Sequence, residues 1–94
     1  MPAIEKTLQN DKAYIPRDWR DIDGDKSDTV DLPGTCIGIA IETAAAVKVE
    51  FSGGNIRTIP AVIWTSKGLF IEGHFTRVWS TGTGVHGEIW GAFV

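Results

Sequence analysis

The sequence predicts an all-β protein: a small antiparallel β-sandwich or barrel of roughly five to six short strands with an extended N-terminal arm. Short runs rich in Ile, Val and Phe, several of them alternating with polar residues, recur along the chain and indicate strands. Clusters of Gly, Ser, Thr and Asn separate these runs and are typical of tight turns. The chain has 94 residues, of which 43% are hydrophobic, so it is long enough for one folded domain only.

Composition divides the chain near Pro33 into an arm, residues 1–33, and a β-sandwich body, residues 34–94. Up to Gly34 the chain holds eight acidic and five basic residues, whereas the rest holds four of each and nine of the eleven glycines. Pro16 and Pro33 exclude a long helix from the arm, which is therefore expected to be mostly extended or irregular. The longest apolar run is far shorter than a membrane-spanning helix, so a soluble protein is expected.

The first strand of the body is expected where Ile37, Ile39 and Ile41 alternate with small residues, which places the three β-branched side chains on one face. Cys36, the one cysteine, comes just before them and is interpreted as a small core residue. A second strand, residues 47–51, alternates apolar with charged side chains and is typical of a half-buried strand.

A hairpin is predicted next, because residues 52–55 (SGGN) tolerate positive φ and separate the second strand from a further extended run, residues 56–59. Pro60 ends this run, and residues 62–64 are expected to extend the strand after a break. Residues 66–68 then provide a second turn.

The last part of the chain is also expected to be extended. Residues 69–80 form one kinked strand or two, because Gly73 interrupts the pattern. Residues 81–84 (TGTG) resemble part of a phosphate-binding loop, but a strand follows them, which favours a hairpin turn. In the final strand, residues 85–94, one face is expected to carry Val85, Ile89 and Phe93 and the other His86, Glu88 and Trp90.

The sequence contains no convincing catalytic or metal-binding constellation. Residues 21–27 alternate oxygen ligands as a calcium loop does, but Lys26 and Leu32 stand where an EF-hand needs Gly and Glu, so a solvated acidic loop is favoured. The two histidines and the cysteine lie on separate predicted strands, which argues against a zinc site or a nucleophile pair. His86 is expected to pair with Glu88 at the surface. We therefore expect no enzymatic activity, no metal and no cofactor.

The tryptophans of the body leave one binding function open. Trp64, Trp79 and Trp90 would form an aromatic platform for a glycan if they shared a face, although burial in the core or at a subunit interface is favoured. Nucleic acid is not an expected partner, because the net charge is −3 and the basic residues of the body are balanced by acidic ones.

The arm is expected to dock onto the body, a neighbouring subunit or another partner. It carries Tyr14, Ile15 and Trp19, large apolar side chains that a solvated tail rarely holds. Arg17 and Arg20 flank Trp19 and would pair with carboxylates of the partner surface.

A homo-oligomer is expected as well. Trp90 and Phe93 of the final strand would leave apolar edge surface in water, so we assign them to an oligomer interface. With a single cysteine the chain has no internal disulfide to stabilise so small a domain, which also favours assembly. A ring of copies is the expected form.

Four segments resemble a family of small virion proteins of tailed phages and gene transfer agents, the spike base proteins that sit on the capsid and hold a fibre. The segments are SDTVDLPG (residues 27–34), CIGIAIE (36–42), VKVEFSGGN (47–55) and RVWSTGTGVHGEIWGAFV (77–94). The TGT turn within its flanking strands is the most specific of these elements. Trp79, Trp90 and residues 1–22 depart from the family's pattern.

The resemblance implies a non-enzymatic structural protein located in the virion, attached to the capsid as a spike base or as a decoration (cement) protein. The implied partners are the major capsid protein, further copies of the chain in a pentamer or trimer, and a fibre protein, with neither nucleic acid nor a membrane among them. Two alternatives stay open: a head–tail joining or tail component of the same virion, and a small glycan-binding β-module.

Overall fold

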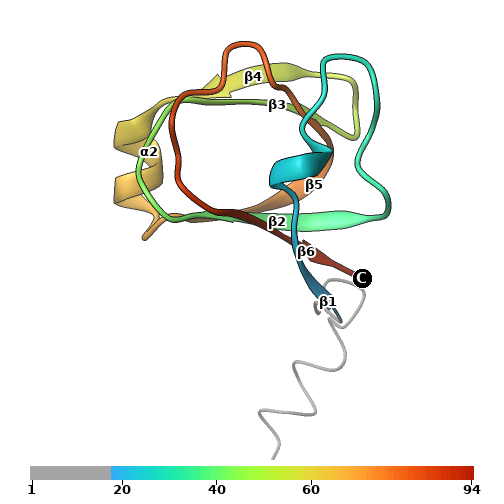
Figure 1. Ribbon diagram of the computed structural model, residues 1–94, viewed down its shortest axis with the longest axis horizontal. Coiled ribbons are helices and arrows are strands. Elements are labelled where there is room, and N and C mark those ends of the chain that lie inside the picture. Colours follow the sequence, from blue (N-terminus) through green and yellow to red (C-terminus); the bar gives the residue numbers. More distant parts are fainter. Residues whose placement is uncertain (1–17) are drawn as a thin grey trace, which may run out of the picture.

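A computed structural model describes residues 18–94 of the chain, and the all-β prediction is confirmed (Figure 1). Six antiparallel strands form one sheet in the order β1-β6-β2-β5-β3-β4. The sheet curls so that β3 and β4 lie across the core from β2 and β6 (Figure 1). The elements are β1 Asp18–Asp21, the 3-10 helix η2 Asp23–Asp25, β2 Cys36–Ile41, β3 Val47–Phe51, β4 Ile56–Ile59, the α-helix α2 Ala61–Ser66, β5 Phe70–Val78 and β6 Ile89–Phe93.

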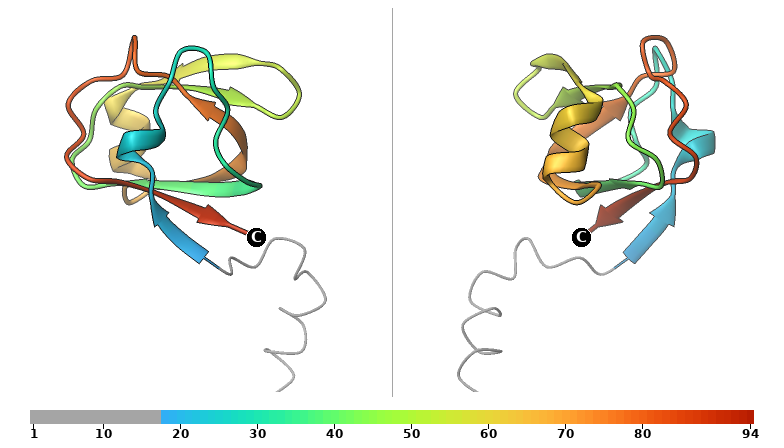
Figure 2. Two further views of the ribbon diagram at one scale, coloured as in Figure 1. Left: turned by 45° about the vertical axis from the view of Figure 1, so that its right-hand side comes forward. Right: turned by 90° about the vertical axis from the view of Figure 1, so that its left-hand side faces the viewer.

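The described part of the predicted arm belongs to the body. Residues 18–21 form the edge strand β1, which pairs with β6 beside the C-terminus (Figure 2). Ile22 and Leu32 are buried in the same hydrophobic core as the strands, and the backbone N–H of Ile22 donates to the carbonyl of Ile89 at 3.0 Å. The predicted boundary at Pro33 therefore does not separate an arm from the body, and the unit that shares this core begins no later than β1.

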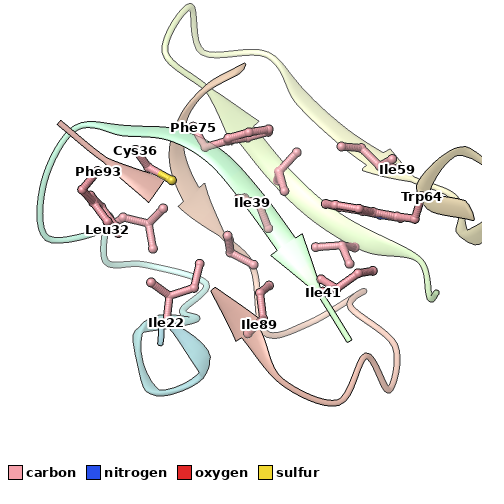
Figure 3. Close-up of a cluster of buried hydrophobic side chains, with 13 residues drawn as sticks. Ile22, Leu32, Cys36, Ile39, Ile41, Ile59, Trp64, Phe75, Ile89 and Phe93 are labelled. Carbon is pink, nitrogen blue, oxygen red and sulfur yellow. The ribbon is translucent and has the colours of Figure 1, made fainter. Parts of the chain in front are cut away.

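The core fills the space inside the curled sheet (Figure 3). Its buried members come from the strands, the helix and the N-terminal loop; they are Ile22, Leu32, Cys36, Ile39, Ile41, Val47, Val49, Ile59, Trp64, Phe75, Val78, Ile89 and Phe93. Cys36 is confirmed as a core residue, with 1% of its surface exposed. Its burial raises the pKa of the Cys36 thiol, which keeps the sulfur protonated at neutral pH.

The prediction that Ile37, Ile39 and Ile41 share one face of a strand is wrong, because β2 contains a β-bulge near its start. Cys36 pairs with Phe93 and Gly38 pairs with Ala92, so the extra residue between them interrupts the alternation. Cys36 therefore points into the core together with Ile39 and Ile41. Ile37 is turned to the outer face of the sheet, where it lines a cleft instead of joining the core.

The predicted hairpin after β3 is confirmed. β3 and β4 pair in register from Val47 opposite Ile59 to Glu50 opposite Ile56. Gly54 in the connecting turn has a φ of 88°, a conformation that glycine adopts without steric cost.

Residues 62–64 belong to the helix α2, so the prediction of a strand there is wrong. Pro60 is the N-cap of the helix and has extended backbone, with a φ of −72° and a ψ of 158°. Of the helical side chains, Trp64 points into the core, whereas Val62 and Ile63 are exposed. Burial of one large indole decides the local structure here over the β propensity of Val and Ile. The turn predicted over residues 66–68 is the C-terminal end of this helix.

Residues 70–78 form the single strand β5, but the segment after it differs from the prediction. β2 lies between β5 and β6 in the sheet, so residues 81–84 belong to a connection that crosses over β2 and are not a hairpin turn. β6 begins only at Ile89, and the predicted faces of residues 85–94 fail before that point. Val85 is exposed and His86 is buried.

Candidate functional site

A cleft of about 490 Å³ opens on the outer face of the sheet. Side chains from four neighbouring strands, β1, β6, β2 and β5, bring together Trp19, Ile37, Phe70, Glu72, Gly73, His74 and Ala92. Trp19 is 47% exposed, so a large aromatic surface on the wall of this cleft faces solvent. The described part of the chain thus offers an apolar concavity on the side of the sheet that faces away from the core.

Small residues on the middle strands create the cleft. The Phe70 ring lies over Gly38, where an added Cβ would come within 2.7 Å of a ring carbon. Ala92 on β6 also lines the cleft. The rings of Trp19 and Phe70 are in contact, with centroids 5.6 Å apart. The bulge in β2 adds Ile37 to the same surface. Larger residues at the two small positions would fill the space that the aromatic rings bound.

The cleft is mainly apolar, and the charges around it are mixed, because Glu72 and His74 line it and Lys67 lines an adjoining hollow with Phe70 and Glu72. Glu72 is the carboxylate among the lining residues of the cleft, where no Lys or Arg is found. A second hollow of about 220 Å³ adjoins Trp90 on the same sheet, and its charged lining residues are Glu42 and Glu88. The Trp90 Nε1–H donates to Glu88 Oε1 at 2.9 Å. A ligand of the cleft would therefore be largely apolar.

Two segments that carry the resemblance, residues 27–34 and the first part of residues 77–94, contact each other. Arg77 Nη2 lies 2.8 Å from Asp31 Oδ1, and its guanidinium also donates to the backbone carbonyls of Asp28 and Thr29. The Asp28 carboxylate accepts hydrogen bonds from the backbone N–H of Thr81, at 2.9 Å, and from the Thr81 hydroxyl. The TGT turn is therefore held by an acidic run distant in sequence, which gives both segments a structural role.

These hydrogen bonds from Thr81 lower the pKa of Asp28 below its ordinary value. Because the folded state binds this proton more weakly than the unfolded state does, the carboxylate stabilises the fold at neutral pH. The contribution is fully present above the unfolded-state pKa of about 4 and is lost as the pH falls through the lowered pKa.

We expect Asp28→Asn to lower the urea midpoint of unfolding at pH 7 and to lower it progressively less below a pH of about 4, where the wild-type carboxylate is itself protonated. Urea unfolding of both chains from pH 7 to pH 2.5 tests this. Asp25→Asn is the matched control, because it removes a carboxylate from the same acidic run without touching the TGT turn. A midpoint difference that stays constant over the whole range would contradict the assignment.

His86 is buried, so the predicted surface pair with Glu88 is wrong. Its Nδ1 donates to the carbonyl of Gly87 at 2.8 Å, and its Nε2 accepts from Lys26 Nζ at 3.0 Å. Lys26 also pairs with Asp23 at 3.1 Å. His86, Lys26 and Asp23 thus connect the segment between β5 and β6 to η2, and their role is structural.

The predicted docking and interface residues have different outcomes. Tyr14, Ile15 and Arg17 lie outside the described residues. Trp19 lies at the cleft and Trp90 at the neighbouring hollow, both partly exposed. Arg20 stacks on the Phe93 ring within the chain, 5.5 Å from its centroid. Phe93 itself is only 4% exposed and packs in the core, so it is not available to a second copy as predicted.

Three further features considered from the sequence are a metal site, a membrane-spanning helix and a platform of tryptophans. In this range no cluster of His, Cys, Asp and Glu could hold a metal ion, and no helix has the length and apolar character to cross a membrane. Trp64 is fully buried and Trp79 is held against Lys48, whose Nζ lies 4.3 Å from the ring centroid. Trp64, Trp79 and Trp90 therefore do not form a shared platform.

Of the residues that line the cleft, Trp19 was predicted as a docking residue from the sequence, and the others were not. Its other walls come from strands that meet only in the folded sheet, and Ile37 reaches it only because of a bulge. The one signal in the sequence was the pair of small residues, Gly38 and Ala92, since a small residue within a strand often lies where a large group approaches closely.

Comparison of the chain with protein-family models, with curated proteins and with solved structures gives no match.

Proposed function

We propose that the protein is a non-enzymatic structural component of a tailed phage or phage-like particle, attached to the capsid as a spike base or decoration protein. The observation that carries this proposal is the mutual binding of residues 27–34 and 77–84, through Asp28, Asp31, Arg77 and Thr81. Two of the four segments in which the chain resembles spike base proteins, residues 27–34 and 77–94, thus contact each other and hold one part of the fold. A resemblance confined to short, unconnected motifs would have less weight.

The outer face supports a role in assembly. Trp19 and the cleft give an exposed aromatic surface, and large exposed aromatic groups are the usual anchors of protein interfaces. In this proposal Tyr14, Ile15, Arg17 and Trp19 dock onto a partner, with Arg20 supporting β1 from within the chain. The partners are the major capsid protein, further copies in a pentamer or trimer, and a fibre protein.

A head–tail joining or tail component of the same virion is the alternative within this class. A glycan-binding module is a weaker alternative, because the three tryptophans on which it depended do not share a face.

Immunogold labelling of purified particles with antibodies against this chain, followed by cryo-electron microscopy, tests the proposal. We expect label and density on the capsid surface. Label at the tail or at the head–tail junction would support the alternative within the virion, and particles without the chain would overturn the proposed function. Glycan binding is tested separately by isothermal titration with bacterial surface polysaccharides, where tight binding would overturn a purely structural role.

A further inference from the structure

The strand β1 is an edge of the sheet, and among residues 18–94 no strand lies on its far side (Figure 2). The backbone N–H of Ile22 donates to the carbonyl of Ile89, and this pair continues the register of β1 and β6. Because backbone groups alternate in direction along an antiparallel strand, the N–H and C=O of Trp19 and Asp21 point away from β6. An edge with such groups is a template for a further strand.

The side of β1 that faces the core carries one charge of each sign. Asp18 lies opposite Phe93 in the sheet, and the Arg20 guanidinium stacks on the same Phe93 ring. Both charged side chains reach solvent, with 62% of Asp18 and 45% of Arg20 exposed. They lie 3.9 Å apart within the chain, which makes a weak surface pair. Both charges are therefore accessible to a neighbouring strand.

The other side of β1 carries Trp19, which lies opposite Ala92 and forms one wall of the cleft. The indole is 47% exposed. A strand added beside β1 with a large apolar side chain opposite Trp19 would remove part of this surface from water, which favours association.

A second copy of β1 meets these requirements. When two copies of β1 pair antiparallel about Trp19, the two Trp19 residues lie opposite each other and exchange their outward N–H and C=O groups. Asp18 of each copy then lies opposite Arg20 of the other, at positions where opposite charges stabilise a strand pair. The two-fold symmetry forms this charge pair at both ends of the contact.

Other pairings of the two sheet edges bring like charges together. A shift that places Trp19 opposite Asp21 also places Arg20 opposite Arg20 of the second copy. Pairing of β1 with β4, the other edge of the sheet, over the full length of both strands places Arg20 opposite Arg57. Like charges directly opposite each other destabilise a strand pair, so the register centred on Trp19 is favoured.

We propose that β1 is a self-association surface, on which the β1 strands of two copies pair antiparallel about Trp19 and join their sheets into one. The contact is isologous and closes at two copies, so a pentamer or trimer needs a further contact elsewhere. The inference does not require a place in the virion. It goes beyond the proposed function by identifying a second copy as the partner of Trp19.

Reversal of the charges in the full-length chain tests the pairing, with sedimentation equilibrium up to about 1 mM protein as the measurement. Asp18→Arg and Arg20→Asp each turn both charge pairs into like charges, so each is expected to raise the dimer dissociation constant at least about tenfold. Arg57→Asp on β4 is the control and should leave the constant unchanged. A wild-type chain that is monomeric throughout, or single variants that dimerise as the wild type does, would overturn the proposal.

An equimolar mixture of the Asp18→Arg and Arg20→Asp chains separates contacts between copies from effects within one chain. In each variant the two residues of its own chain carry the same charge, whereas across the contact every pair is opposite in charge. We expect the mixture to recover the dimer that neither variant forms alone, with circular dichroism showing that both chains are folded. A mixture that stays monomeric would overturn the proposal.

Disulfide trapping tests the register. A chain with Asp18→Cys is mixed with a chain with Arg20→Cys and oxidised; the native Cys36 is buried and does not interfere. Residues directly opposite in an antiparallel pair are close enough for a disulfide, so we expect a covalent heterodimer at a yield roughly tenfold above that of Asp18→Cys mixed with Arg57→Cys. A higher yield with Arg57→Cys would show that β1 pairs with β4 and would overturn self-pairing of β1.

The inference and the proposed function fail separately. Particles that lack the chain would remove the proposed function and leave the dimer in place. Particles that contain the chain, together with charge variants that sediment as the wild type does, would remove the inference alone.

Discussion

Replacing Ile22 by alanine is expected to destabilise the protein by about 2–5 kcal/mol, as large-to-small substitutions in a closed core do. Ile22 follows the edge strand β1 and is completely buried, and its backbone N–H is bonded to Ile89 on β6 (Figure 3). A loss of this size is a large part of the about 5–15 kcal/mol that stabilises a typical domain. The residue thus anchors the N-terminal loop to the sheet.

Urea unfolding of the full chain measures this effect as a lower midpoint with an unchanged slope. Ile56→Ala on β4 is the matched control, because this isoleucine is 42% exposed and its loss should cost less than about 1 kcal/mol. Equal destabilisation by the two substitutions would contradict the placement of Ile22 in the core. The same reasoning predicts that deletion of residues 1–22 unfolds the body, so tests of docking need substitutions and not truncation.

The pattern of polar and apolar residues predicted the structure correctly where neighbouring segments of the sequence determine it. Alternation in β3 and the SGGN turn predicted the β3–β4 hairpin correctly, because a strand and its neighbour in sequence need only a turn that permits positive φ. The expectation of a small antiparallel β-protein followed from several such elements and is correct.

The pattern failed where contacts distant in sequence decide the structure. His86 was assigned to a surface and is instead buried against Lys26, a residue sixty positions earlier in the chain. Residues 81–84 have hairpin chemistry, but β2 occupies the place beside β5 that a hairpin partner would take. Neither outcome is encoded in the local alternation of polar and apolar residues.

In the candidate site, too, one residue could be predicted from the sequence and the others depend on contacts distant in sequence. Trp19 could be singled out from the sequence, because a large aromatic residue in an acidic, proline-bounded segment needs a partner surface. The position of that surface could not be predicted, since Ile37 turns outward only through the bulge and Phe70 reaches Trp19 only across two intervening strands.

Trp64 is expected to be the most sensitive single position in the described chain. It is the largest fully buried side chain, and it joins α2 to the core beside Ile41 and Ile59 (Figure 3). Trp64→Ala should cost about 3–5 kcal/mol, because the void cannot close without moving the helix. Thermal and urea unfolding measure the loss, and Val62→Ala on the same helix, where the side chain is 69% exposed, is the control with a small expected effect.

Trp64→Phe should cost far less than Trp64→Ala, because phenylalanine lacks the indole N–H. The Trp64 Nε1–H is buried and has no hydrogen-bond partner among residues 18–94. An unpaired buried donor costs about 1–3 kcal/mol, and phenylalanine removes this cost while it keeps most of the apolar volume. The lost contacts and the relieved penalty therefore nearly offset each other. If Trp64→Phe proved as destabilising as Trp64→Ala in the same urea measurement, the indole N–H would have to contribute favourably, and an unpaired donor in this core would be the wrong description.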